Sequence, residues 1–198
     1  MCEPACFVVT KKQVFWSENG DSHELIIEEN GLKEMDVHNN STFIRVEIVP
    51  PERDYRKPLR DWVYKLDQDI KPEWYEAKEV EERCRLYLKD WRKSNVVMPN
   101  ETVSNLNKYK AAVYGTIKSV HGGTIESVNG GTIKFVYGGR IKSVEGGTIK
   151  FVHGDFPSQI TGNTTIINYG LLTPEILQSS QAVMVDRSKE TVACYVGK

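Results

Sequence analysis

The sequence predicts an α+β domain over residues 1–98, a short β-solenoid over residues 99–170, and a C-terminal helix and hairpin over residues 171–198 that caps the solenoid or joins two copies. Three observations support this fold class. An eight-residue repeat fills much of the second half, mixed helical and strand-like patterns precede it, and two short apolar segments around a polar turn follow it. The repeat is the most specific of the three, because its five copies follow one another without a gap.

The repeat begins at Gly115 and reads GTIKSVHG, GTIESVNG, GTIKFVYG, GRIKSVEG and GTIKFVHG, ending at Gly154. Each unit combines a run of β-favouring residues with a Gly-Gly corner, and its glycines and branched residues argue against a helix. Isoleucine and valine recur three positions apart, so a flat strand would send them to opposite faces. We favour a bend that points both inward; in the alternative, isoleucine and the Ser/Phe position face the interior.

Every second unit matches more closely than adjacent units do, so the structural period is 16 residues, with two strands per coil and two unlike faces. One face is basic, aromatic and rich in histidine, and the other is small and polar. The candidate binding residues lie on the first face and are Lys118, Lys134, Lys150, Phe135, Phe151, His121, Tyr137 and His153.

Stacking of the coils would bring equivalent side chains about 4.8 Å apart, the distance between hydrogen-bonded strands. Lysines at that interval repel one another unless solvent or an anionic partner offsets their charge. The aromatic residues beside them would form a protein contact surface or be covered by another part of the chain. Phosphates along one DNA strand do not match the spacing, so we do not expect nucleic-acid binding.

Charge is unevenly divided along the chain. Residues 1–107 carry 16 Lys/Arg against 21 Asp/Glu, a net charge of −5, whereas residues 108–154 carry 7 against 2, a net charge of +5. This division is compatible with assembly or with an anionic partner, but we favour the simpler interpretation, in which the charges only solvate two surfaces. No apolar run approaches the roughly 18 residues of a membrane span, and the first residues do not resemble a secretory signal, so we expect a cytoplasmic protein.

The N-terminal domain alternates between strand and helix patterns. CFVVT, QVFWS, TFIRVEIV and WVYKL predict strands. ELIIEE predicts a short helix that is capped by Asp21 or Ser22 and ends at Gly31. Residues 76–93 predict the longest helix, and its core-facing side is formed by Val80, Cys84, Tyr87, Leu88 and Trp91.

Few residues of this domain are suited to catalysis or metal binding. Cys2 and Cys6 are four apart, but no second Cys or His pair follows at a usual zinc-ligand interval, so we expect no metal and no cofactor. A hydrolase would need a cleft lined by His23 and the pair Asp67 and Asp69. No catalytic motif accompanies these residues, and we expect a protein that is not an enzyme.

The segment WVYKLDQDIKPEWYEAKEVEERCRLYLKDW resembles a domain of uncharacterised bacterial and bacteriophage proteins, where a similar stretch precedes octapeptide arrays. The resemblance implies a shared architecture and attaches no activity to it. The octapeptide is also distantly similar to the 16-residue coils of bacterial ice-nucleation proteins, but it lacks their Thr-x-Thr ladders and has few units. The residues that carry the first resemblance are Asp67, Gln68, Asp69, Pro72, Trp74, Tyr75, Arg83, Cys84 and Arg85.

The C-terminal region predicts a closing structure for the solenoid. DFPSQITG and NTTIINYG form a last irregular coil, and Thr173-Pro174-Glu175 opens a short helix. AVMVD and TVACYVG predict a hairpin around Arg187-Ser188-Lys189. The open end of a solenoid carries unpaired backbone groups, so this tail is expected to cap the end or contact a second copy.

Together these features favour a non-enzymatic interaction or assembly module, whose solenoid is a rigid spacer or docking surface for a protein partner or a second copy. The alternative is a phage counter-defence or sequestering protein that binds an anionic ligand, such as a nucleotide, on the Lys/aromatic face. Neither function involves a membrane.

Overall fold

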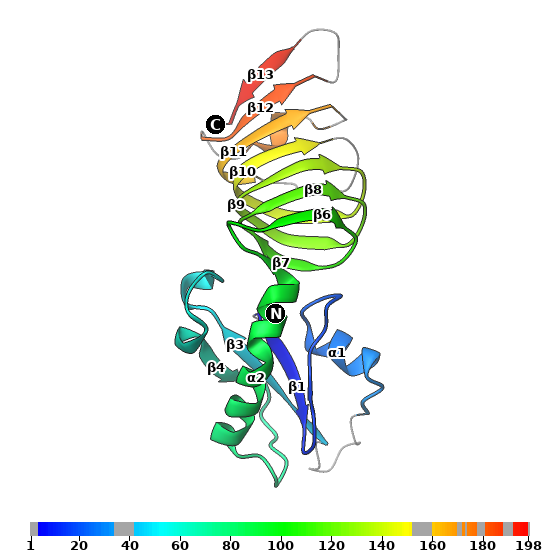
Figure 1. Ribbon diagram of the computed structural model, residues 1–198, viewed down its shortest axis with the longest axis vertical. Helices are drawn as coiled ribbons and strands as arrows, with labels where there is room; N and C mark the ends of the chain where they lie inside the picture. The colour runs from blue at the N-terminus through cyan, green and yellow to red at the C-terminus, as the bar shows by residue number, and fades with distance from the viewer. Residues whose placement is uncertain are drawn as a thin grey trace. The chain divides into compact units, whose positions relative to one another are not determined.

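The computed structural model divides the chain into two compact units, Met1–Ser94 and Asn95–Lys198 (Figure 1). It describes residues 4–33, 42–151, 160–169, 172, 174–177, 181–187 and 192–197. The first unit has the α+β composition expected from the sequence, and the second contains the β-solenoid.

The first unit is built on an antiparallel sheet with the strand order β2-β1-β3-β4. All four predicted strands are confirmed, although the second is shorter than QVFWS implied. Apolar side chains are buried along the central pair of strands. The strands are β1 (Cys6–Thr10), β2 (Val14–Phe15), β3 (Phe43–Val49) and β4 (Val63–Leu66).

Helix α1 (His23–Glu29) begins at Ser22, one of the two predicted caps, whose hydroxyl accepts a hydrogen bond from the Leu25 amide at 3.2 Å. The chain leaves the helix through Gly31, which has a left-handed φ of 59°. Ile26 of this helix packs against the side chains of β1 and β3.

Helix α2 (Ala77–Asn95) buries most of the predicted face, namely Val80, Cys84, Leu88 and Trp91. Tyr87 was wrongly placed in that face, since 41% of it is exposed. It lies at the margin of the apolar stripe, where its hydroxyl can remain in water.

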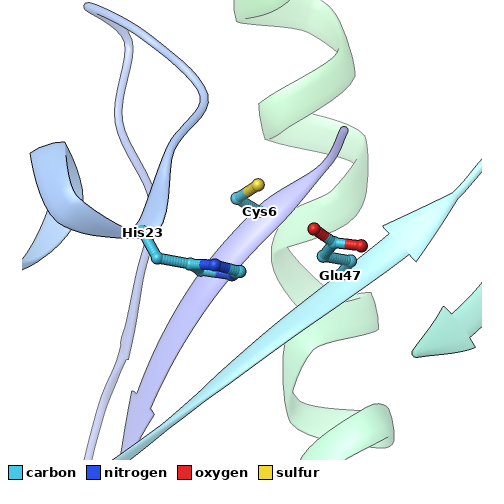
Figure 2. Close-up of side chains that lie close together, drawn as sticks. All are labelled: Cys6, His23 and Glu47. Carbon is cyan, nitrogen blue, oxygen red and sulfur yellow. The ribbon is translucent and has the colours of Figure 1, made fainter. Parts of the chain in front are cut away.

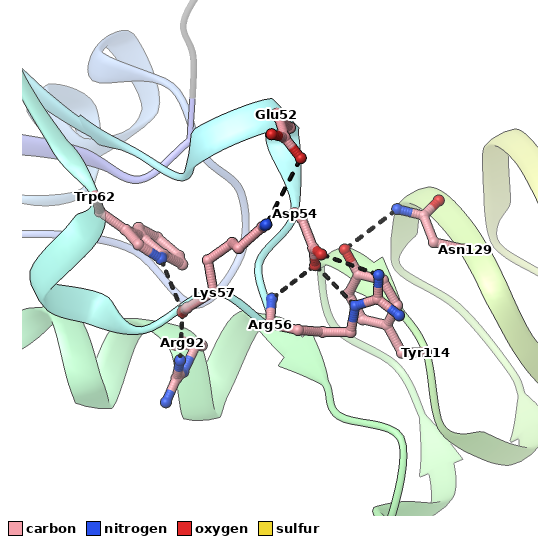
Figure 3. A network of polar contacts seen from close by, with 8 residues as sticks. All are labelled: Glu52, Asp54, Arg56, Lys57, Trp62, Arg92, Tyr114 and Asn129. Carbon is pink, nitrogen blue, oxygen red and sulfur yellow. Dashed lines mark hydrogen bonds and ion pairs between the residues drawn. The ribbon is translucent and has the colours of Figure 1, made fainter.

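Polar contacts and aromatic rings fix α2 within the first unit. The Lys57 carbonyl accepts hydrogen bonds from Trp62 Nε1 at 3.2 Å and from Arg92 Nη1 at 3.3 Å (Figure 3). Tyr55 stacks on Trp91 at 6.1 Å, and Trp62 meets both rings edge-on. The short helices η1 (Pro51–Arg53) and η2 (Leu59–Asp61) lie in the loop between β3 and β4.

The second unit is a stack of strands that pair in parallel through most of its length. Strands β9 and β10 run through the Gly-Gly corners, so each contributes to both sides of a coil. The strands are β5 (Val96–Val97), β6 (Thr102–Leu106), β7 (Lys110–Val113), β8 (Thr116–Val120), β9 (Thr124–Val136), β10 (Arg140–Phe151), β11 (Ile160–Asn168), β12 (Val183–Asp186) and β13 (Ala193–Val196).

The register confirms the 16-residue coil. Thr116 pairs with Thr132 and Thr132 with Thr148, while Thr124 pairs with Arg140 on the other side. Consecutive eight-residue units therefore lie on opposite faces, and every second unit stacks in register.

The solenoid core confirms that isoleucine and valine both point inward. The repeat positions are at most 1% exposed, and they form one continuous cluster. The alternative with the Ser/Phe position inside is wrong, since Phe135 is 40% exposed. The buried repeat residues are Ile117, Val120, Ile125, Val128, Ile133, Val136, Ile141, Val144 and Ile149.

The C-terminal hairpin is also confirmed. β12 pairs in parallel with β11 and so extends the solenoid sheet, whereas β13 returns antiparallel to β12. The short helix expected after Thr173 is a single turn, η3 (Pro174–Ile176), and Thr173 itself lies outside the described residues.

Close stacking at the Gly-Gly corners predicts different tolerance of neighbouring glycines. Gly123 has a φ of 78°, and a Cβ there would overlap the Lys108 carbonyl oxygen; at Gly122 nothing lies within 4 Å of such a Cβ. Gly123→Ala should lower the free energy of unfolding by about 2 kcal/mol or more, and Gly122→Ala by less than about 0.5 kcal/mol. Urea unfolding followed by the β-sheet circular dichroism signal measures both, and equal losses would contradict the stacking argument.

Candidate functional site

Two groups of residues stand out, one on the solenoid surface and one inside the first unit. On the solenoid, the register of β8 with β9 places Lys118 beside Lys134 and Ser119 beside Phe135. Both lysine side chains are exposed. The predicted column of lysines is therefore formed, with its members separated by one strand spacing of about 4.8 Å.

Aromatic rings stack along the same face. The His121 and Tyr137 rings lie 5.1 Å apart at 17°, and the Phe135 and Tyr137 rings lie 6.1 Å apart at 23°. Phe135 and Tyr137 remain 40% and 49% exposed, so the rings pack on one another while keeping open surface. We name Lys118, His121, Lys134, Phe135 and Tyr137 the ladder face.

The opposite face of the solenoid neutralises its own charge. Lys142 stands at the same position of its unit as Lys134, and its Nζ lies 2.8 Å from Glu126 Oε1 in the neighbouring coil. Among the described residues, no carboxylate oxygen lies within 4.0 Å of the Lys118 or Lys134 ammonium group. The net positive charge of the repeat therefore concentrates on the ladder face.

Three further residues were predicted on this face, and the structure describes the side chain of one of them, Lys150. Lys150 lies on β10, which pairs with β11 of the next coil, and its side chain is half-buried. Phe151 is the last residue of β10, and its side chain and His153 lie outside the part of the chain that the structure describes.

The second group is Cys6, His23 and Glu47, which we name the Cys6 cluster. Cys6 on β1 is the direct cross-strand partner of Glu47 on β3, so both side chains leave the same face of the sheet. His23, the first residue of α1, reaches over that face toward both strands (Figure 2). The three ligand atoms lie within 4.8 Å of one another, and all three residues are buried.

Both nitrogens of the His23 ring are engaged. Nδ1 lies 3.0 Å from Asp67 Oδ2, and Nε2 lies 3.1 Å from the Val46 carbonyl oxygen. Burial lowers the pKa of His23, while the Val46 carbonyl and the Asp67 carboxylate oppose that shift.

Sequence reasoning singled out His23, Asp67 and Asp69 but could not pair them. The structure joins His23 to Asp67 and not to Asp69, and both of these carboxylates are exposed. A hydrolase would require His23 to reach substrate, and its side chain is only 1% exposed. His23 therefore has a carboxylate beside it but almost no access to solvent, and the expectation that the protein is not an enzyme stays a prediction.

The cysteines differ in their surroundings. Cys84 is buried on α2, where burial raises the pKa of its thiol to about 12 and keeps it protonated. Cys194 is exposed on β13, and Cys2 lies outside the described residues. Cys6 is thus the described cysteine that has an imidazole and a carboxylate beside it.

Comparison of the chain with known proteins gave no matching family model, no matching curated protein and no matching solved structure. Among the described residues, no helix has the length and apolar character needed to cross a membrane.

Burial of His23 predicts a pH-dependent stability of the first unit. Its folded pKa lies below the ordinary 6.5, so the unfolded chain takes up a proton first as the pH falls through that value. The free energy of unfolding should then decrease from pH 7.5 to pH 5.5, by at most about 1.4 kcal/mol per pH unit. Fluorescence of the tryptophans, all of which lie before residue 95, follows urea unfolding of this unit.

The matched control for this experiment is the exposed His121. His23→Gln should flatten the decrease between pH 6.5 and 5.5, and His121→Gln should leave it unchanged, because only the first removes a buried imidazole. A wild-type slope in His23→Gln would show that another group controls the acid sensitivity.

Proposed function

We propose that the chain is a non-enzymatic interaction module, in which the solenoid is a rigid scaffold that presents the ladder face to an acidic segment of a partner protein. The observation that carries this proposal is the asymmetry of the coil. Lys142 on one face is paired with Glu126, whereas Lys118 and Lys134 on the other stand side by side next to exposed rings. Carboxylates of a partner would relieve the repulsion between those lysines.

The chemistry of the ladder face is that of a protein contact. Exposed aromatic side chains supply much of the energy at protein interfaces, and flanking charges provide orientation and rate. The His121, Phe135 and Tyr137 rings are already stacked, so little side-chain freedom is lost when a partner covers them.

A nucleotide is the alternative ligand, because a row of cations beside stacked rings also suits a phosphate and a base. Small-molecule sites are concave and enclose most of the ligand, whereas the ladder face is the outer side of parallel strands. We therefore favour the protein segment and treat nucleotide binding as an outcome of the same experiment.

The proposal extends to self-association and origin. β13 lies at one end of the solenoid sheet. Its last residue, Val196, and the residue that precedes the strand, Val192, are each 63% exposed. An exposed, apolar edge strand is suited to pairing with a second copy.

The resemblance of the 67–85 segment to bacterial and bacteriophage proteins supports a bacterial or phage cytoplasmic protein as part of this proposal.

Lys134 and Lys142 form a matched pair for testing the ladder face, because they hold the same repeat position on opposite faces. Fluorescence anisotropy with a fluorescein-labelled peptide of alternating Glu and Tyr measures binding. Lys134→Gln should weaken binding about three- to tenfold and Lys142→Gln less than about twofold, and binding should fall as salt rises.

Equal losses of peptide affinity in the two variants would show that binding depends only on the overall charge, and would refute the ladder face as a site. Binding of ATP that Lys134→Gln weakens, without binding of the peptide, would replace the protein partner by the nucleotide.

Self-association is tested separately by size-exclusion chromatography with light scattering. We expect a dimer that becomes monomeric in Val196→Lys, because a charge at the edge of β13 opposes strand pairing. Lys134→Gln is the control and should remain dimeric. A strictly monomeric wild-type protein at high concentration would remove the assembly part of the proposal.

A further inference from the structure

The Cys6 cluster combines three donor types inside one small space. Its thiol, imidazole and carboxylate are the ligands that zinc and similar transition-metal ions prefer, whereas calcium and magnesium favour oxygen alone. We propose that Cys6, His23 and Glu47 bind one transition-metal ion of the zinc class.

The geometry requires only small side-chain movements. Bonds of about 2.0–2.3 Å in a tetrahedral site place the ligand atoms roughly 3.3–3.8 Å apart. The ligand atoms of Cys6, His23 and Glu47 already lie within 4.8 Å of one another. Rotation about side-chain bonds by amounts that move each atom about 1 Å would close the site around an ion.

The backbone holds two of the ligands in register. Cys6 and Glu47 are cross-strand partners, and next to them the Ala5 and Ile48 backbones exchange a pair of hydrogen bonds of 2.9 Å. The Asp21 carboxylate accepts a further hydrogen bond from the Cys6 amide at 2.9 Å. The spacing of the thiol and the carboxylate is therefore set by the sheet and not by flexible loops.

The third ligand, His23, is oriented by a hydrogen bond from its second ring nitrogen. Asp67 Oδ2 accepts a hydrogen bond from His23 Nδ1 at 3.0 Å, the carboxylate–histidine arrangement that supports metal ligation in proteins. The other nitrogen, Nε2, then faces the ion and gives up its 3.1 Å contact with the Val46 carbonyl. Asp67 acts as a positioning residue and does not touch the metal.

Charge balance also favours a divalent ion. Ligation converts the Cys6 thiol to a thiolate, and with the Glu47 carboxylate this gives two negative charges beside a double positive charge. Glu47 is 5% exposed, so the ion would stabilise a carboxylate that lies in the interior. Three protein ligands leave a fourth coordination position for water or another ligand.

Because the ligands are buried, the ion is expected to enter as the domain folds. The test therefore refolds tag-free full-length protein from urea with Co²⁺, a spectroscopic substitute for Zn²⁺. The expected result is a near-ultraviolet thiolate-to-cobalt charge-transfer band with visible bands of tetrahedral cobalt, about one ion per chain, and displacement of the cobalt by Zn²⁺. No band in the wild-type protein would overturn the proposal.

Cys84 provides the matched control, since it is equally buried but is not among the grouped ligands. Cys6→Ser should abolish the charge-transfer band, while Cys84→Ser, Cys194→Ser and Cys2→Ser should retain it. A band that persists in Cys6→Ser, or disappears in Cys2→Ser, would overturn this ligand set.

Two further variants keep the test decisive if Cys6→Ser does not fold. Glu47→Gln preserves shape and should weaken Co²⁺ binding by at least about tenfold, and Asp67→Asn should weaken it about 10–100-fold through His23. Circular dichroism checks that both variants fold. Wild-type affinity in both folded variants would overturn the site.

Discussion

Four columns of side chains, two of isoleucine and two of valine from the octapeptide, hold the second unit together. Each member is buried against its equivalents in the coils before and after it, and each fully buried side chain contributes about 1.5–3 kcal/mol. The parallel backbone pairing follows from this packing, since the columns align only when the coils are in register. Glycines at the corners let the backbone turn tightly enough for both residues to face inward.

The packing of the solenoid core also determines where the surface side chains lie. A side chain such as Lys134 repeats along its face at the strand spacing, so any property encoded in alternate units becomes a continuous stripe. On one face the charges of Lys142 and Glu126 cancel, whereas the stripe on the ladder face keeps an excess of positive charge. The functional proposal depends on this difference more than on any single residue.

The octapeptide allowed the solenoid, its period and the placement of Lys118 beside Lys134 to be predicted, because every contact is a fixed number of residues away. The first unit offered no such rule. Its four strands could be identified from local pattern, yet the pairing of Cys6 with Glu47 depends on a register between distant strands, and that of His23 with Asp67 depends on how α1 lies on the sheet. Tyr87 shows the same limit, since helical periodicity does not define where a buried face ends.

Because each coil has 16 residues, the length of the solenoid changes in fixed steps. Insertion or removal of two consecutive octapeptides would change the stack by one rung of about 4.8 Å and leave the register of all other rungs intact. Duplication within the gene could therefore adjust the distance between the first coil and the terminal hairpin in equal steps, each adding one more lysine and one more ring position to the same stripe. Chain length, spacing and the number of binding positions would then vary together in evolution.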